Sequence, residues 1–180
     1  MTIYIALLRG INVGGHNIIK MADLKSLLEE LGLKKVKTYI QSGNVLFESN
    51  EKPEKLTQLL EDEIAKKFGF PVPVVLRTAE GFERIIRTCP FPTESLKEEE
   101  SIQVAFLAGQ PSQEGVQQLG SIQSNQDEFK IEGKDVYLYL RQSIRTSKLA
   151  QQLPKLGVPA TVRNWKTVVK LDSLAKAFKE

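Results

Sequence analysis

The sequence predicts an α+β fold in which one βαββαβ order of elements occurs twice in tandem, with a linking helix between the two units and a further helix at the C-terminus. Apolar residues alternate with period two in some segments and recur at helical spacing in the segments between them. Glycine and proline stand at the places where one pattern gives way to the next. The second half of the chain then repeats the element order of the first half.

The first unit, residues 1–77, opens with an alternating strand over residues 2–9 and a loop that contains glycine. Leucines at i, i+3, i+4 and i+7 then predict a helix, and Gly32 follows where a left-handed residue commonly ends a helix. Pro53 suits the first position of a second helix, and prolines in the last strand place that strand at a sheet edge. After the first helix come a hairpin with strands at 36–41 and 45–47 that turns at Ser42-Gly43, a helix from Pro53, and a strand over 71–76. This order is that of a ferredoxin-like unit.

The second unit, residues 101–180, shows little residue identity with the first and repeats only its element order. Residues 78–100 link the two, with a helix around Phe82 and Ile85 followed by a loop rich in proline and glutamate from Cys89 onward. The predicted elements are a strand over 102–107, a helix over 111–119, a hairpin with strands at 128–131 and 136–140, a helix over 146–153, a strand over 160–163 and a terminal helix over 165–178.

Composition and charge narrow the classes of protein to consider. The chain has 180 residues, 41% of them hydrophobic and 26% charged, which is typical of a globular protein with a sizeable core. Its formal net charge of +3 is no footprint of a nucleic-acid binder, and no apolar run approaches the roughly 20 residues that cross a bilayer. A single cysteine excludes an internal disulfide framework and a multi-cysteine metal site. We therefore expect a cytoplasmic protein without a metal site or membrane contact, and the sequence indicates no particular cofactor or oligomeric state.

The predicted topology brings three connections of the first unit to one end of its sheet, which we call the rim. They are residues 9–17 after the first strand, 41–44 in the hairpin turn, and 68–70 before the fourth strand. These segments are rich in Gly, Asn, Ser and Gln, which turn tightly and offer N–H donors to a ligand. The first loop also leads to a helix N-terminus, which favours anions. We therefore predict a site for a small polar or anionic ligand at the rim, with Arg9 supplying positive charge.

The candidate ligand-binding residues fall into two groups. They are Arg9, Gly10, Asn12, Gly14, Gly15, Tyr39, Gln41, Ser42, Gly43 and Asn44 at the rim, and Arg163, Asn164 and Trp165 as further candidates from the second unit. In an alternative interpretation, the glycines only supply positive φ and the asparagines only cap turns. The spacing of the glycines does not match G-x-G-x-x-G, so a known nucleotide-binding fingerprint is absent. For the second group, Asn164 suits the N-cap of the last helix, and its neighbours suit packing anchors.

The outer faces of the two sheets raise a second class of function, binding of RNA or single-stranded nucleic acid. In the first unit we expect Ile3, Ile5, Leu7, Val45 and Phe47 to face the helices and Tyr4, Ala6, Leu8, Tyr39, Gln41, Asn44 and Leu46 to face outward. In the second unit we expect Val136, Leu138 and Leu140 inside and Tyr137, Tyr139, Ala105 and Leu107 outside. Exposed tyrosines on such sheets stack bases in RNA-recognition domains. The alternative is that these faces are covered and the tyrosines are buried with their hydroxyls hydrogen-bonded.

An enzyme of unknown reaction is the third class, and its candidate proton carriers are His16 and Asp23. His16 is the only histidine of the chain, and Asp23 is the acid nearest to it in sequence. A lone histidine in a loop is more often simply solvated. Cys89 suits a small buried apolar role better than that of a nucleophile.

Several motifs are long enough to indicate a family. They are Ala6-Leu7-Leu8-Arg9-Gly10-Ile11-Asn12-Val13-Gly14-Gly15, Lys20-Met21-Ala22-Asp23-Leu24, Thr38-Tyr39-Ile40-Gln41-Ser42-Gly43-Asn44-Val45, and Arg163-Asn164-Trp165 with Thr167. Together they closely resemble the uncharacterised, mostly bacterial family called domain of unknown function 1697, over nearly the whole chain. The sequence departs from the family's usual ending at Val162 and Lys166. The resemblance implies a compact α+β protein of two related units, carries no activity with it, and places the signature residues on the rim and on residues 163–165.

Overall fold

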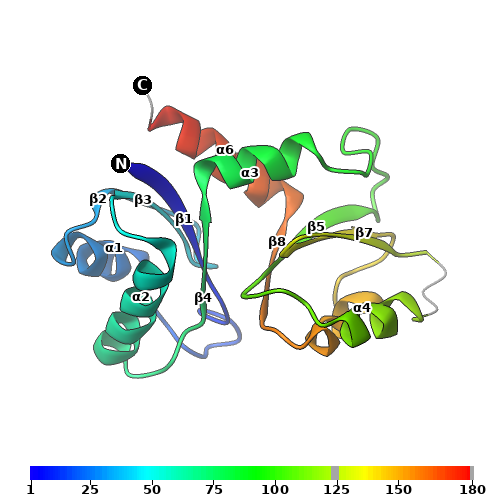
Figure 1. Cartoon of the computed structure of the whole chain (residues 1–180), viewed down its shortest axis with the longest axis horizontal. Coiled ribbons are helices and arrows are strands. Elements are labelled where there is room, and N and C mark those ends of the chain that lie inside the picture. The colour runs from blue at the N-terminus through cyan, green and yellow to red at the C-terminus, as the bar shows by residue number, and fades with distance from the viewer. Residues whose placement is uncertain (123–125, 179–180) are drawn as a thin grey trace. The chain divides into compact units, whose positions relative to one another are not determined.

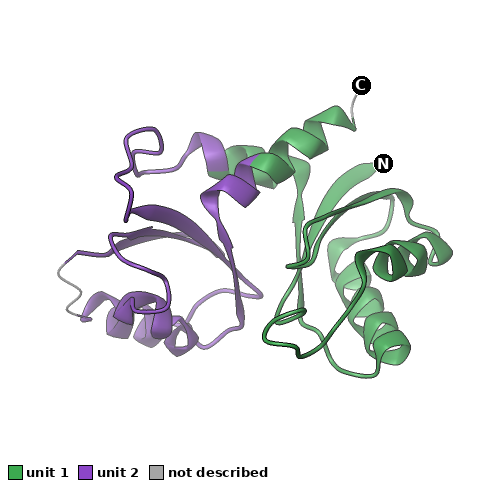
Figure 2. Cartoon of the chain, turned by 180° about the vertical axis from the view of Figure 1, so that it is seen from behind, with its two compact units in different colours: residues 1–85, 170–180 green, residues 86–169 purple. Residues whose placement is uncertain are grey.

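The computed structural model describes residues 1–122 and 126–178 and confirms the α+β fold with two ferredoxin-like units (Figure 1). Unit 1 consists of residues 1–85 and 170–180, and unit 2 consists of residues 86–169 (Figure 2). The terminal helix, which the sequence placed whole with the second unit, is divided between the two.

Unit 1 contains one four-stranded antiparallel sheet with helices packed on one face. Its elements are β1 Thr2–Leu8, α1 Met21–Glu30, β2 Lys34–Tyr39, β3 Asn44–Ser49, α2 Pro53–Phe68, β4 Val74–Thr78 and the start of α3 Ala79–Arg87. The strand order β2-β3-β1-β4 puts β4 at an edge, as predicted, although Pro71 and Pro73 precede the strand and were expected within it. Pro53 occupies the first turn of α2, again as predicted.

The two faces of β1 are the reverse of those predicted from the sequence. Tyr4 pairs with Phe47 and Ala6 with Val45, and residues directly opposite each other in antiparallel strands share a face. Tyr4, Ala6 and Leu8 therefore belong to the core under α1 and α2, together with Val45 and Phe47. The other face holds Ile5, Leu7 and Leu46, which are also fully buried. Because both sets of β1 side chains are apolar and buried, alternation alone does not reveal which set meets the helices.

Unit 2 repeats this sheet with the order β6-β7-β5-β8. Its elements are β5 Ser101–Leu107, α4 Gln113–Gly120, β6 Glu128–Glu132, β7 Asp135–Leu140, α5 Lys148–Gln151, the 3₁₀ turn η1 Leu153–Leu156, β8 Ala160–Asn164 and the start of α6 Trp165–Ala177. The helix predicted over 146–153 is shorter, because Ser147 caps it by accepting a hydrogen bond from Ala150 N–H and Pro154 cannot extend an α-helical ladder.

The outer sheet face of unit 2 is covered, so the premise for base stacking there is wrong. Tyr137 and Tyr139 lie on that face as predicted, yet they are only 1% and 7% exposed. The segment that follows α3 leads across unit 2 to β5 (Figure 1). It covers the tyrosines, since the Thr88 and Tyr137 hydroxyls lie 3.2 Å apart and Phe91 packs edge-on against Tyr139. Burial accordingly raises the pKa of the Tyr137 hydroxyl.

The prediction that Ala105 and Leu107 lie beside these tyrosines is also wrong. Ala105 pairs with Val136, so both belong to the core on the helix side of the sheet, with Leu107, Leu138 and Leu140. The assignment of Val136, Leu138 and Leu140 to that core was correct.

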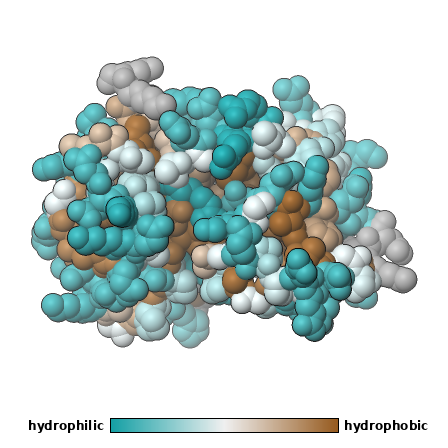
Figure 3. Space-filling model, viewed as in Figure 1, coloured by the Kyte–Doolittle hydropathy of each residue, from teal (hydrophilic) through white to brown (hydrophobic). Residues whose placement is uncertain are grey.

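The described part of the chain contains no helix that is long and apolar enough to cross a membrane. Hydrophilic side chains cover most of the face shown in Figure 3, and hydrophobic side chains appear between them in patches.

Candidate functional site

The connections after β1, in the hairpin and before β4 meet at the rim, as the predicted topology requires, and the last of them does so through Pro73, beyond the predicted residues 68–70. Leu8 N–H donates to Gly43 O at 2.9 Å, which joins the end of β1 to the hairpin turn. Arg9 N–H donates to Pro73 O at 3.0 Å, which joins it to the residues that lead into β4. Asn12 Nδ2 donates to Gln41 O at 2.8 Å, which joins the loop itself to the hairpin turn.

Asn12 braces the loop between β1 and α1. Its Nδ2 also donates to Ile19 O at 3.0 Å, while its Oδ1 accepts from Ile19 N–H at 2.8 Å. Its backbone N–H donates to Asn17 O, and Asn17 Nδ2 donates to Gly10 O. Asn12 and Asn17 both have positive φ, at 56° and 52°, a conformation that asparagine tolerates better than most residues. The asparagine side chains of this loop therefore form hydrogen bonds that hold the loop backbone, as the alternative interpretation expected.

Replacing Asn12 by alanine should destabilise unit 1 by roughly 2–4 kcal/mol. The substitution removes three side-chain hydrogen bonds worth about 1 kcal/mol each and leaves buried partners less well satisfied. Asn17→Ala removes one exposed hydrogen bond and should cost about 1 kcal/mol. Urea denaturation followed by circular dichroism measures both. Equal losses for the two variants would contradict a bracing role for Asn12.

The hairpin turn is fixed by its own side chains. Asn44 is fully buried, and its Nδ2 donates to Tyr39 O at 2.8 Å and to Ser42 Oγ at 3.0 Å. Ser42 and Asn44, both candidate ligand residues, are therefore used within the turn. Ile40 has φ of 50° and is 47% exposed, which is an unusual conformation for a β-branched residue.

The side chains that the rim leaves open are those of Arg9, His16, Lys20 and Gln41. All four residues are exposed, and within residues 1–122 and 126–178 none of these side chains forms a hydrogen bond or ion pair. None of the four side chains carries a negative charge. The α1 N-terminus beside them has no side-chain cap. The rim can thus offer a guanidinium, an ammonium and an amide to a ligand on a braced backbone.

The tip of the loop is a tight turn at Gly14 and Gly15. His16 N–H donates to Val13 O at 3.0 Å across it, and both glycines have positive φ. In the described part of the chain, the N–H groups of Gly14 and Gly15 donate no hydrogen bond, and neither does that of Gly10. These are the backbone donors that the sequence analysis predicted for the rim.

The second group of candidates lies in unit 2. Arg163 is 9% exposed, its Nη1 donates to Val162 O at 3.0 Å, and burial lowers the pKa of its guanidinium to about 10. Asn164 Oδ1 accepts from Thr167 N–H at 2.9 Å, which confirms the predicted N-cap of α6. Trp165 is half-buried. Packing and helix capping thus account for the burial and the hydrogen bonds described for these three residues.

The structure brings no partner group to either catalytic candidate. His16 and Asp23 are both exposed, and no hydrogen bond joins them in the described residues. Among the same residues, no group of His, Cys, Asp or Glu side chains is arranged to hold a metal ion. The role of His16 or Asp23 as a proton carrier stays a prediction.

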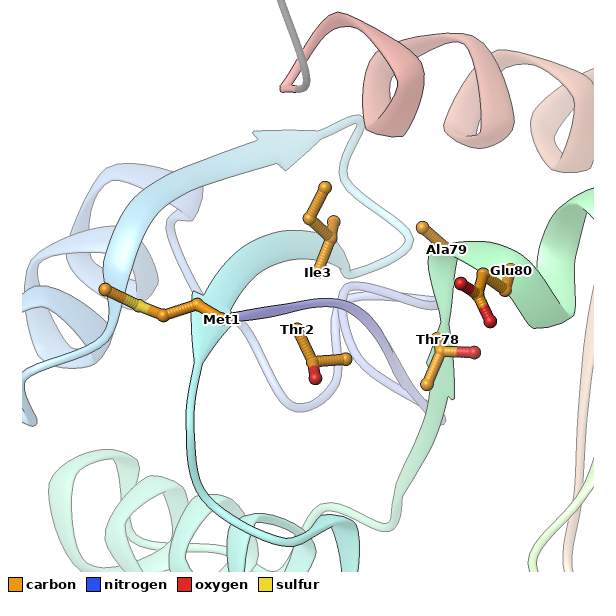
Figure 4. A pocket seen from close by; sticks show the side chains of 6 residues that line it. All are labelled: Met1, Thr2, Ile3, Thr78, Ala79 and Glu80. Carbon is orange, nitrogen blue, oxygen red and sulfur yellow. The ribbon is translucent and has the colours of Figure 1, made fainter.

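Two features of the structure were not predicted from the sequence. In unit 2, the buried Asp127 accepts hydrogen bonds from Arg141 N–H, Gln142 Nε2 and Ser147 Oγ at 2.7–2.9 Å, which fixes the loop after β7. In unit 1, a cavity of about 360 Å³ lies where β1 begins and β4 ends (Figure 4). Its lining residues are Met1, Thr2, Ile3, Thr78, Ala79 and Glu80. Because β1 runs toward the rim, this cavity is at the opposite end of the sheet, and the carboxylate of Glu80 does not suit an anion. No motif in the sequence signals either feature.

The chain is similar to a family of proteins and to a solved structure. Residues 1–137 match the family described as protein of unknown function (DUF1697). Among solved structures, the chain is similar to the conserved bacterial protein SP0830 from Streptococcus pneumoniae, with 30% sequence identity and a TM-score of 0.78. That similarity covers 97% of this chain and 98% of the other. No curated protein matches the sequence.

Proposed function

The chain belongs to the DUF1697 family of proteins of unknown function, and we propose that it binds a small anionic ligand at the rim of unit 1. The observation that carries the proposal is that some rim side chains hold the backbone in place while others remain open to a ligand. Hydrogen bonds of Asn12, Asn17 and Asn44 hold the backbone, while the side chains of Arg9 and Lys20 stay exposed and without an acidic partner in the described residues. A preorganised loop with open cationic groups lowers the ordering cost of binding an anion.

Backbone strain supports the same proposal. From Gly10 to Asn17, two non-glycine residues, Asn12 and Asn17, have positive φ. Non-glycine residues in this region cost free energy, and such strain tends to cluster at ligand sites. The open N–H groups of the loop add donors of the kind that bind phosphate or carboxylate oxygens.

Removing the charge of Arg9 should weaken anion binding at least threefold. The test uses pyrophosphate as the probe, with dissociation constants measured by isothermal titration calorimetry for the wild type and for Arg9→Gln. An exposed charge contributes modestly in water, on the order of 1 kcal/mol, which sets the size of the effect. The same comparison at raised salt should shrink the difference, because exposed charges are screened.

Lys52→Gln is the matched control for Arg9→Gln. Lys52 is exposed in the same unit and precedes α2, after β3 has run away from the rim. Its replacement removes the same charge and should leave pyrophosphate affinity within a factor of about two. Equal weakening by both variants would mean that net charge alone attracts the anion, and absence of binding to the wild type would refute the proposal.

A further inference from the structure

We propose that the anion bound at the rim also carries an apolar group, which packs on Val13, Ile18 and Ile40. This inference rests on the proposed function and adds the chemical class of the ligand, a small amphipathic anion such as an organic phosphate. The three side chains are named the apolar rim patch below.

The apolar rim patch consists of three exposed hydrophobic residues, each next in sequence to a residue of the Asn12 hydrogen-bond network. Val13, Ile18 and Ile40 are 65%, 57% and 47% exposed. In the described part of the chain, six large hydrophobic residues are exposed, and these are three of them. They come from two connections that the Asn12–Gln41 hydrogen bond holds together, since Val13 follows Asn12 and Ile40 precedes Gln41. Ile18 likewise precedes Ile19, whose backbone N–H and O both bond to the Asn12 side chain. Exposed apolar residues that the fold holds on neighbouring connections among polar ones are candidates for a binding site.

Ile40 gives the patch a feature that folding alone does not require. Its φ of 50° is a conformation in which asparagine and glycine are at ease and a β-branched residue is strained. This side chain is nonetheless about half exposed. An apolar contact that forms only when a ligand binds accounts for both its type and its exposure.

The charged residues near the apolar rim patch favour a ligand whose second group is negatively charged. Arg9 and Lys20 are exposed basic groups at the two ends of the loop that carries Val13 and Ile18, and Asp23 and Glu61 are acids of the same unit. Glu61 Oε2 already accepts a hydrogen bond from Val74 N–H, and in the described residues neither acid forms an ion pair with the basic groups. The surface is therefore complementary to a negative group beside an apolar one.

The size of the patch favours a small molecule over a protein. A stable protein interface buries roughly 800 Å² on each partner, and three partly exposed aliphatic side chains supply a fraction of that. The same side chains are enough to cover a short alkyl chain or one face of a ring.

Two alkyl phosphates with the same head group provide the test. Hexyl phosphate should bind the wild-type protein at least fivefold more tightly than methyl phosphate, as measured by isothermal titration calorimetry, because only the longer chain reaches the patch. Ile40→Asn should reduce this advantage to less than twofold and leave methyl phosphate affinity unchanged. Asparagine accepts the positive φ of residue 40, so the variant is expected to fold, and Val13→Ser provides a second variant at the other connection.

Ile144→Asn is the control, because Ile144 is an isoleucine of unit 2 that is 36% exposed. It should leave the advantage of hexyl phosphate intact. Equal affinity of the two phosphates for the wild type overturns the inference and leaves the proposed function standing, whereas no binding of either phosphate overturns both. An advantage that survives Ile40→Asn and Val13→Ser also overturns the inference, because the alkyl chain then binds elsewhere.

Discussion

Gly43→Ala is expected to lower the free energy of unfolding of unit 1 by roughly 2–5 kcal/mol. Gly43 has φ of 92°, and an alanine in that region costs about 1–2 kcal/mol. A Cβ at this position would also lie 2.7 Å from Ile11 Cδ1 and 2.9 Å from Leu8 Cβ, so the turn must move away from the end of β1. Overpacking of this kind typically costs a further 1–3 kcal/mol. Urea denaturation followed by circular dichroism measures the loss.

Gly15→Ala separates the two causes. Gly15 also has positive φ, at 76°, but a Cβ there meets nothing within 4 Å. Its replacement should therefore cost only about 1 kcal/mol, the backbone strain less the entropy that alanine removes from the unfolded chain. A loss for Gly43→Ala no larger than that for Gly15→Ala would show that the hairpin turn does not press against the end of β1.

Gly115→Ala is expected to destabilise unit 2 by about 3 kcal/mol. Gly115 lies in α4, and a Cβ there would approach Lys155 O to 2.3 Å and Leu156 Cα to 2.8 Å. Both are backbone atoms of η1, which a hydrogen bond from Ser112 N–H to Leu156 O ties to the start of α4. Backbone cannot turn aside as a side chain can, so α4 and η1 must separate and expose core. The melting temperature of the variant measures the effect.

Gly120→Ala is the control within the same helix. A Cβ at Gly120 would meet only Phe129 Cζ, at 4.0 Å, which is an ordinary contact. Alanine also has the higher helix propensity, so stability should stay unchanged or rise by less than about 1 kcal/mol. If Gly115→Ala proved as mild as Gly120→Ala, the close approach of α4 to η1 would be disproved.

The sequence was sufficient to predict the rim because chain direction determines it. Once the βαββαβ order is known, the connection after β1, the hairpin turn and the start of β4 have to meet at one end of the sheet. The tight contact between Gly43 and β1 was not predictable in the same way. The sequence showed a glycine in a turn, but the neighbours of that turn come from a segment more than thirty residues earlier.

Other features of the structure were not predicted because no pattern in the sequence indicates them. Every residue of β1 from Tyr4 to Leu8 is buried, so alternation did not distinguish the face under the helices from the other face. Asp127 looks like any loop acid until the fold brings Gln142 and Ser147 to its carboxylate. The cover over Tyr137 and Tyr139 comes from an irregular segment, whose path no periodicity predicts.

Among the candidate site residues, the sequence predicted location better than role. The asparagines and Ser42 were expected to orient a ligand, and the structure uses their side chains to brace the rim. Of the original rim set, Arg9 and Gln41 have exposed side chains and Tyr39 has a half-buried one, and in the described residues none of these side chains forms a hydrogen bond. Lys20 and the backbone N–H groups of the loop add to them. The side-chain hydrogen bonds distinguish a bracing role from a ligand-binding role. These hydrogen bonds depend on the three-dimensional arrangement of the connections, which the sequence pattern does not give.

Amide chemical shifts test the central claim most directly. In ¹H–¹⁵N spectra of the whole chain titrated with pyrophosphate, the account predicts saturable shifts at Gly10, Gly14, Gly15 and Lys20, with the amides of unit 2 and those lining the cavity at Thr78–Glu80 unchanged. Shifts centred on unit 2 or on that cavity, or no saturable shift at the rim glycines, would contradict it.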